Sequence, residues 1–400
     1  MAWSDYTTGE RIKILRGPGM TQEELAEAAG VSVATIRKAE GDRGVGLPSL
    51  LKISAALHTD VSVMLGQQEP RRAMHRDDRA MLRALSRAVH DTAAGIGGGV
   101  EPVSGREVAA GVAAAWDRYR TGQFAVAGAL AAVAVQQAAA AAGAVPVGRE
   151  SSAAVVMTDA YRLASYVANQ FGARDLAYAA IGHAQAQAER ASDPLREAMV
   201  ASGRSWIYLR DARLEQAAQT AERSYTMIEP GYGDSDPYLL AIYGWHVTFA
   251  AVVAAREGDV ARADDLLAQA RAVAARMGRD VKVNGTAFGP VTVQAQAVGI
   301  SVSTGRPAQA LKAYATVGDV SVLPPAARNR LMLDVALALA DSRRWDASLD
   351  TLLEVCTAHP DWARHQALPD VIARRAARSN LSASRYRKLA AILGTSHTIR

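Results

Sequence analysis

The feature that most constrains this chain is a pair of short helical patterns at residues 21–40, each with its own start signal. Thr21 and Glu24 have the spacing of a capping box, in which each side chain bonds the backbone N–H of the other residue. Gly30 ends this first pattern, because glycine adopts a positive φ at little cost. Ser32 then caps a second pattern that runs to Glu40. The stretch must therefore fold as two short helices joined by a tight turn.

Apolar positions on both sides extend this pair to a set of five predicted helices. Ile12 and Leu15 predict a helix upstream. Downstream, the apolar positions between Leu50 and Leu57 predict a fourth helix, and residues 61–65 predict a fifth. Two short helices joined by a glycine turn are typical of a helix-turn-helix motif.

The order and spacing of these helices resemble the Xre/Cro-type repressor family. The matching text is GERIKILRGPGMTQEELAEAAGVSVATIRKAEGD, followed by LPSLLKISAALHTDVSVML. In that family the second helix of the motif enters the major groove of double-stranded DNA. The resemblance implies that Val33, Ala34, Arg37 and Lys38 face bases, that Gln22 and Thr35 hold phosphates, and that Arg43 adds a backbone contact.

The sequence departs from the common pattern of that family in two ways. Val33 and Ala34 are apolar, so base readout has to come from Arg37 or Lys38 to guanine and from methyl contacts to thymine. Residues 1–69 carry seven Lys or Arg and nine Asp or Glu, so this part is not basic overall. Affinity for phosphate then needs the arginine-rich segment that follows, or a second subunit. The alternative is that the five helices are packing units with a solvated charged face. The cations of this part gather in Arg11, Lys13, Arg16, Arg37, Lys38 and Arg43.

Composition divides the chain into three parts. Residues 1–69 form the predicted DNA-binding domain. Residues 70–105 hold an arginine-rich connecting helix at 71–91 and a glycine-rich linker at 92–105. From residue 106 to residue 400 every long segment has the 3.6-residue period of a helix, and no alternating strand pattern stands out. The predicted architecture is all-α, with a five-helix λ-repressor-like head joined to a long helical body.

The body carries a weak internal repeat. Five turns, at residues 172, 212, 258, 305 and 343, are spaced by about 38 to 47 residues, more than the roughly 34 of a tetratricopeptide unit. Small residues recur seven positions before each turn and five and twelve positions after it, where closely crossing helices need them. The triplets are Ser165, Ala177 and Ala184; Ser205, Ala217 and Ser224; Ala251, Ala263 and Ala270; Val298, Ala310 and Val317; and Ala336, Ser348 and Val355.

This pattern resembles a degenerate tetratricopeptide array that covers about residues 106–400, although the aromatic and proline signatures of that family are largely missing. Another α-solenoid or a helical bundle is the alternative. Stacked helix pairs curve into a superhelix with a concave face, which the first helix of each pair lines in tetratricopeptide arrays. The resemblance places Arg162, Tyr166, Asn169, Gln170, Trp206, Arg210, Trp245 and Arg256 on that face, followed by Ser303, Arg330 and Asp341.

Aromatic side chains beside arginine and amide groups suit a peptide or an anionic small molecule. The alternative is that Trp206 and Trp245 fill gaps left by the many alanines. The basic segment from Val371 to Arg400 is either a solvated cap or a surface that approaches DNA or an acidic partner.

Several classes of protein are excluded. The single cysteine, Cys356, rules out an intramolecular disulfide, and the N-terminus lacks the pattern of a secretory signal. Residues 124–147 are uncharged and long enough to span a bilayer, but alanine gives little drive into lipid, so we expect two packed helices there. We therefore predict a cytoplasmic protein without a membrane segment. No P-loop, dinucleotide-binding glycine motif or zinc-spaced histidine pair occurs, so we predict no enzyme, no catalytic residues, no metal and no cofactor.

A DNA-binding head on such a body resembles the tetratricopeptide-bearing Xre regulators, among them the peptide-responsive quorum-sensing receptors of the RRNPP type. That resemblance implies a homodimeric transcription regulator whose body senses a peptide, a small molecule or a protein partner. An interaction scaffold with auxiliary DNA binding is the alternative, and salt-dependent binding to DNA discriminates between the two.

Overall fold

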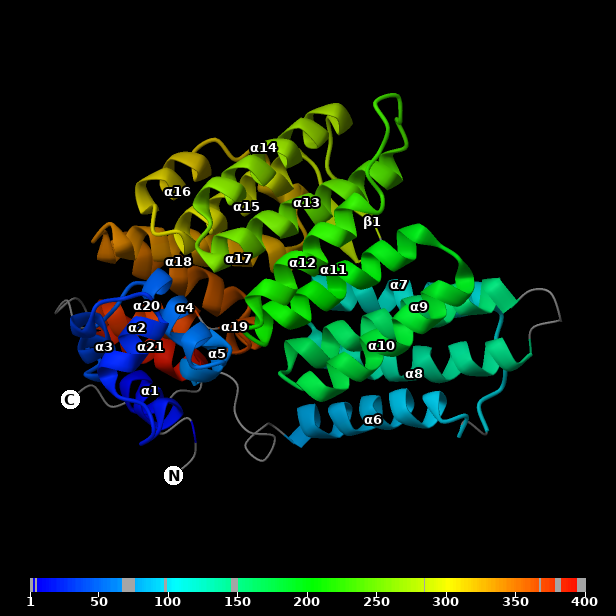
Figure 1. Ribbon diagram of the computed structural model, residues 1–400, viewed down its shortest axis with the longest axis horizontal. Helices are drawn as coiled ribbons and strands as arrows, with labels where there is room; N and C mark the ends of the chain where they lie inside the picture. Colours follow the sequence, from blue (N-terminus) through cyan, green and yellow to red (C-terminus); the bar gives the residue numbers. More distant parts are fainter. Residues whose placement is uncertain are drawn as a thin grey trace.

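A computed structural model describes residue 3 and residues 6–66, 76–96, 99–144, 150–283, 285–366, 368–377 and 383–393. Across these residues the chain is almost entirely helical, as predicted, with a group of short helices at one end and long paired helices in the rest (Figure 1). We call residues 6–66 the head and residues 105–393 the body. Residues 71–75 of the predicted connecting helix, 97–98 of the predicted linker and 145–147 of the apolar stretch lie outside the described residues, as do 394–400.

The head contains the five predicted helices. They are α1 (Thr8–Arg16), α2 (Gln22–Ala28), α3 (Val33–Glu40), α4 (Leu47–Ala56) and α5 (Val61–Met64). Both predicted caps form, because Thr21 and Glu24 make a reciprocal capping box and the Ser32 side chain accepts the N–H of Thr35. A second capping box, between Thr7 and Glu10, starts α1. Side-chain caps therefore fix where α1, α2 and α3 begin, whereas α4 starts after Gly46 without one.

The connecting helix, α6 (Arg76–Ala93), packs along α8 and α10 of the body. Its apolar face buries Leu85 and Val89 completely. Gly128 of α8 allows this close approach, because a Cβ there would lie 2.3 Å from the sulfur of Met81. The helix thus belongs structurally to the body, and the glycine-rich segment follows it, between Ala93 and Gly105.

In the described part of the body, six consecutive helix pairs precede three C-terminal helices. In chain order they are α7 (Gly105–Arg120) and α8 (Phe124–Gly143), α9 (Glu150–Gln170) and α10 (Arg174–Ala191), α11 (Pro194–Arg210) and α12 (Leu214–Thr226), α13 (Pro237–Glu257) and α14 (Val260–Met277), α15 (Pro290–Ser303) and α16 (Pro307–Tyr314), and α17 (Pro325–Asp341) and α18 (Trp345–Ala358). Each of the five predicted turns lies between the two helices of one pair. Helices packed in this order are consistent with a tetratricopeptide-like array.

The predicted small residues lie where the helices of a pair cross. All fifteen are buried except Val317, which follows the end of α16. In two pairs the crossing includes a hydrogen bond, because the Ser205 hydroxyl donates to the carbonyl of Ala217 and the Ser348 hydroxyl to that of Ala336, each at 2.7 Å.

The sequence pattern missed a sixth unit. Counted from Gly122, which has a φ of 83° between α7 and α8, the same offsets give Ala115, Ala127 and Ala134, and all three are buried. The turn residues of the other five pairs also have positive φ, including Ala212 at 56° and Arg343 at 59°. Glycine suits such a turn best, and a side chain there costs conformational strain.

The array bends until its ends touch. Helix α17 packs against α7. Beyond α18 follow α19 (Pro360–Arg364), α20 (Leu368–Ala377) and α21 (Ala383–Leu393). Trp362 of α19 fills the space beside Gly122, and His365 meets the rings of Phe124 and Phe171 edge-on. The C-terminal helices therefore close the body against its first two pairs.

One prediction about local structure was wrong, and one local feature was not predicted. Residues 124–143 form one helix, α8, where two were expected. A short antiparallel hairpin, β1 (Val281–Val283) and β2 (Thr286–Phe288), lies between α14 and α15, with Val281 opposite Phe288. Its sequence signal was the Asn-Gly pair at positions 284–285, which favours a two-residue hairpin turn. Phe288 is completely buried and occupies the space that a side chain at Gly244 would need.

Among the described helices, α8 and α13 are long and apolar enough to cross a membrane. The most apolar window of α13 is 72% buried against other helices and that of α8 is 44% buried. Core helices of folded proteins pass the same test of length and composition, so these two helices are weak evidence for a membrane span.

Candidate nucleic-acid interface

An ion-pair network holds α3 in the head. Glu40, at the end of α3, is only 3% exposed and lies 2.7 Å from Nε of Arg16 on α1. The amide nitrogen of Gln22 donates to the second oxygen of Glu40 at 2.6 Å. The network therefore joins α1, α2 and α3 and fixes the orientation of α3 relative to the other two helices.

The outer face of α3 carries most of the predicted base-reading residues. Ala34, Arg37 and Lys38 are exposed, whereas Ile36 and Ala39 face the core. Val33 is half-buried against the core. Because β-branched and apolar residues occupy the inner positions, the two cations have only the solvent side of the helix available.

The three residues predicted to contact phosphate differ in how accessible their side chains are. The Thr35 hydroxyl lies 2.9 Å from that of Ser32, within the cap of α3. Gln22 is engaged at both ends of its amide, since its oxygen also accepts from Nε of Arg37 at 3.4 Å. Arg43 is exposed in the loop after α3. Arg43 is therefore the most accessible of the three.

Arg37 also pairs with an acid of the neighbouring helix. Its Nη2 lies 3.1 Å from Glu23 of α2, and both side chains are 61% exposed. Ion pairs with this exposure contribute roughly 0–1 kcal/mol to stability. A base or a phosphate can therefore replace Glu23 at little cost.

Two of the cations predicted to gather near DNA, Arg11 and Arg16, instead form hydrogen bonds within the domain. Arg11 is 1% exposed and its Nε donates to the carbonyl of Trp3 at 2.9 Å. Arg16 is held by Glu40 and also donates to the carbonyl of Met20. The cations exposed around α3 are therefore Arg37, Lys38 and Arg43, and Lys13 is exposed on α1.

This arrangement of caps, turn and exposed helix agrees with a family model that the chain matches, which is described as helix-turn-helix and covers residues 12–63. Residues 12–63 form a helix-turn-helix DNA-binding domain. The domain is of the Xre type and marks the chain as a DNA-binding regulator. No curated protein and no solved structure matches the chain.

The predicted effector residues of the body divide into three groups, and the first is a stack of rings and cations. Tyr166 of α9 lies 4.9 Å from the ring of Trp206 on α11, and the Arg210 guanidinium lies 5.8 Å from that ring. Arg162 stands 5.1 Å from the ring of Trp116 on α7. Burial raises the pKa of Tyr166. Sequence reasoning missed Trp116, because none of the five units counted from the sequence included α7.

The second group is a set of amides that position arginines. The side-chain oxygen of Asn169 accepts from Arg174 at 2.6 Å, and that of Gln170 accepts from Arg210 at 3.5 Å. Asn169 is completely buried. Arg174, at the start of α10, was not predicted, because the sequence shows no signal that it would turn toward α9.

The two residues of the third group, Trp245 and Arg256 of α13, lie in different places. Trp245 is partly buried against a separate apolar core formed mainly by α11 to α15. Arg256 lies where the head meets the body. Of the further positions on this face, Ser303 bonds its own helix and Arg330 pairs with Asp334 at 3.1 Å.

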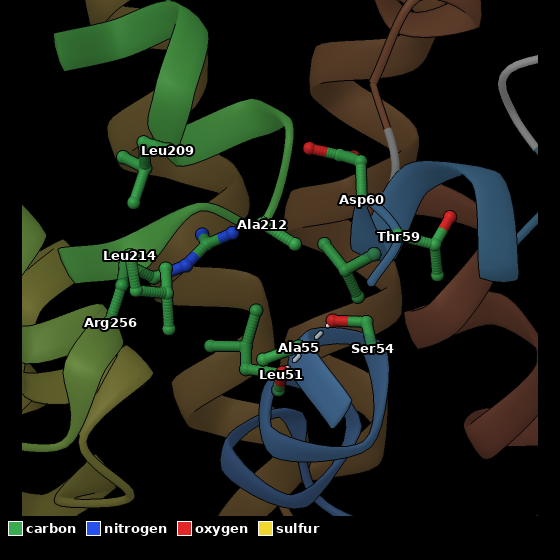
Figure 2. A pocket seen from close by; sticks show the side chains of 10 residues that line it. Leu51, Ser54, Ala55, Thr59, Asp60, Leu209, Ala212, Leu214 and Arg256 are labelled. Carbon is green, nitrogen blue, oxygen red and sulfur yellow. Dashed lines mark hydrogen bonds between the residues drawn. The ribbon is translucent and has the colours of Figure 1, made fainter. Parts of the chain in front are cut away.

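The helix-turn-helix domain rests on the body through α4 and α5. Gly305, at the turn after α15, lies against Pro48 of α4. A small pocket remains at this contact, lined from the domain by Leu51, Ser54, Ala55, Thr59, Asp60 and Val61 and from the body by Leu209, Ala212, Leu214 and Arg256 (Figure 2). The exposed residues of α3 are not among those that line this contact, so docking leaves them accessible.

No group of three or more metal-binding side chains occurs in the part of the chain that the structure describes. Cys356 is buried, and burial raises the pKa of its thiol to about 12. This thiol is therefore protonated at neutral pH and is a poor nucleophile.

Proposed function

We propose that the protein is a sequence-specific transcription regulator that reads DNA through Arg37 and Lys38. The observation that carries the proposal is the exposed outer face of α3. The contacts of Glu40 with Arg16 and Gln22 hold α3 against α1 and α2. An arginine that loses only an exposed ion pair can form two hydrogen bonds with a guanine edge. Val33 and Ala34 are left for contacts with thymine methyl groups.

The proposal includes a homodimer on an inverted repeat. A domain with seven basic and nine acidic residues in positions 1–69 gains little from phosphate contacts alone. Two-fold symmetry doubles both the base contacts and the release of counterions. Half-sites are then expected about 34–36 Å apart, or at a multiple of that spacing.

The body serves in this proposal as the sensing part, for a peptide, a small molecule or a protein partner. The support is the side-by-side placement of Tyr166, Trp206 and Arg210, which offers ring surface and donors together. A ligand alters DNA binding only through its different affinities for two arrangements of the domain and body.

Selection of bound sequences from random duplex DNA, followed by footprinting at several salt concentrations, tests the proposal. We expect a two-fold symmetric consensus and a footprint over both half-sites. A protein that protects one half-site as a monomer in sedimentation contradicts the dimer. Equal affinity for selected and random DNA contradicts sequence-specific regulation and favours an interaction scaffold.

A further inference from the structure

The contact between domain and body places one carboxylate among arginines. Asp60 caps α5, where its Oδ1 accepts from the backbone N–H of Ser62 at 2.7 Å and from the Ser62 hydroxyl. Its Oδ2 lies 3.9 Å from Nη2 of Arg174 and 3.9 Å from Nε of Arg210. Burial favours the neutral acid, but Arg210 and Arg174 lower the pKa of Asp60 below its usual value. Asp60 therefore remains charged although it is 9% exposed.

The fit between this carboxylate and the arginines is incomplete. A separation of 3.9 Å exceeds the roughly 2.7–3.2 Å of a hydrogen bond, so attraction here is electrostatic only. The buried Nε of Arg210 has no acceptor. Arg256 lines the small pocket beside Asp60, reaching into it from the body (Figure 2). Burial lowers the pKa of both Arg174 and Arg256 to about 10, which shows that positive charge is costly at this place.

The neighbouring wall of the body also lacks acceptors. Among the described residues, the indole N–H of Trp116 and the amide nitrogen of Asn169 are buried without a hydrogen-bond partner. Both are donors, as is Nε of Arg210. Trp116 joins this wall through Tyr166, at 5.1 Å between ring centroids, and Tyr166 leads to Trp206 and Arg210. A buried donor without an acceptor is destabilising, so a group rich in acceptors is favoured here.

We propose that Arg174, Arg210 and Arg256 form a binding site for a carboxylate or phosphate group, and that Asp60 of the helix-turn-helix domain is its intramolecular occupant. This inference rests on the sensing role proposed for the body and names the chemistry of the ligand. The pocket has a volume of about 10 Å³ while the domain is docked, room for about one water molecule. A larger anion therefore binds only when Asp60 leaves, and its binding shifts the population toward the undocked arrangement.

The test uses an Asp60→Asn variant of the full chain. Asparagine caps a helix as well as aspartate does, so the variant removes the charge and keeps the start of α5. Calorimetric titrations with inorganic phosphate and, separately, with citrate as the carboxylate probe are compared at constant ionic strength. We expect the variant to bind the probe about tenfold more tightly than the unmodified chain, if Asp60 occupies the site in about nine of ten molecules. Tighter binding of only one probe shows which anion the site accepts.

Controls separate competition from a general charge effect. Glu27→Gln removes the same charge from an exposed position on α2 and is expected to leave the affinity for the probe unchanged. Arg256→Gln, made in the Asp60→Asn background, is expected to lower that affinity at least about tenfold, as loss of one charge-assisted contact implies. Circular dichroism establishes that each variant is folded, and Arg210→Lys, which keeps the charge, replaces Arg256→Gln if the latter does not fold.

Equal affinity in the unmodified chain, Asp60→Asn and Glu27→Gln overturns the inference, as does undiminished binding in the arginine variant that folds. Weak binding that falls equally with added chloride in every variant also overturns it, because that is adventitious anion binding only. Affinity for the selected DNA is measured separately. A chain that shows the competition but binds no specific DNA refutes the proposed function and leaves the anion site standing.

Discussion

The helix-turn-helix domain and the body are both helical, but different forces define their helices. In the domain, side-chain caps start α1, α2, α3 and α5 at Thr7, Thr21, Ser32 and Asp60. In the body, five of the six second helices of the pairs start without a side-chain cap, namely α8, α10, α12, α16 and α18, whereas Asp259 caps α14. Their positions depend on small residues that let two backbones approach. Side-chain caps thus start four of the five helices of the domain, whereas most second helices of the body rely on contacts between helices.

This difference predicts how many helices a given mutation destabilises. A lost cap weakens one helix, whereas a side chain added at a helix crossing displaces two. The surface where the two regions meet includes charged groups such as Asp60 and Arg256, and we expect the coupling between the regions to be weak. The predictions below test that comparison, from the largest expected effect to the smallest.

The largest effect is expected from matched core truncations, one in each region. Ile36 of α3 and Ile181 of α10 are both completely buried. Each change to alanine is expected to cost about 2–5 kcal/mol through lost transfer energy and a cavity. Native-state hydrogen exchange is expected to show the loss for Ile36→Ala in α1 to α5 and the loss for Ile181→Ala in α9 and α10. Equal losses in both regions for either variant would show one cooperative unit and refute the comparison.

A pH-dependent loss of stability is expected from a buried histidine of the body. His246 of α13 is 2% exposed, and burial lowers its pKa from 6.5 to about 4. The unfolded chain therefore binds a proton between pH 6.5 and pH 4 while the folded chain does not, so stability falls by up to about 3 kcal/mol as pH drops through that range. Urea unfolding at several pH values measures this slope. His246→Gln is expected to flatten it, and an unchanged slope in that variant would assign the effect to other groups.

The next effect concerns DNA readout by α3. Arg37→Ala is expected to weaken binding to the selected sequence by about 1–3 kcal/mol and to relax the preference at one position of the consensus. Lys38→Ala is expected to act similarly at a different position. Lys52→Ala, which removes an exposed cation from α4, serves as the control. A loss that is equal on selected and random DNA would make Arg37 a phosphate contact.

The smallest effect is expected from a cap in the domain. Thr21→Ala removes the acceptor for the N–H of Glu24 and is expected to cost about 1 kcal/mol. The loss is measured as a lower midpoint of thermal unfolding of the domain, with binding of the selected DNA as the signal. Thr21→Ser keeps the hydroxyl and is expected to restore most of the stability. If Thr21→Ala also lowers the exchange protection of α9 and α10, the domain is not specified locally.

The sequence predicted the domain well because its signals act over a few residues. Thr21, Gly30 and Ser32 set the ends of α2 and α3 through bonds to backbone groups within three positions. The small residues of the body, such as Ser205 and Ala217, were predictable for a related reason, since a fixed offset from a turn brings them together. The sixth unit around Gly122 followed the same rule and was missed because its turn lies in an alanine-rich stretch.

The role of each residue on the inner face was decided by tertiary structure. The sequence indicated that Tyr166, Trp206 and Arg210 share a face, but Trp116 comes from a helix that meets α9 only after the array folds. Asp60 has the sequence signature of an ordinary helix cap, and it does cap α5. That it also lies beside Arg174 and Arg210, more than a hundred positions away, depends on how the domain docks on the body.

The sequence by itself thus determined the helices, the turns and the helix-turn-helix domain, because caps, glycines and helical periodicity are properties of neighbouring residues. Only the tertiary structure decided which cations remain accessible around α3, which rings stack in the body and which carboxylate faces the arginines. Those outcomes depend on burial and on electrostatic interactions between segments distant in the chain, and no local pattern encodes them.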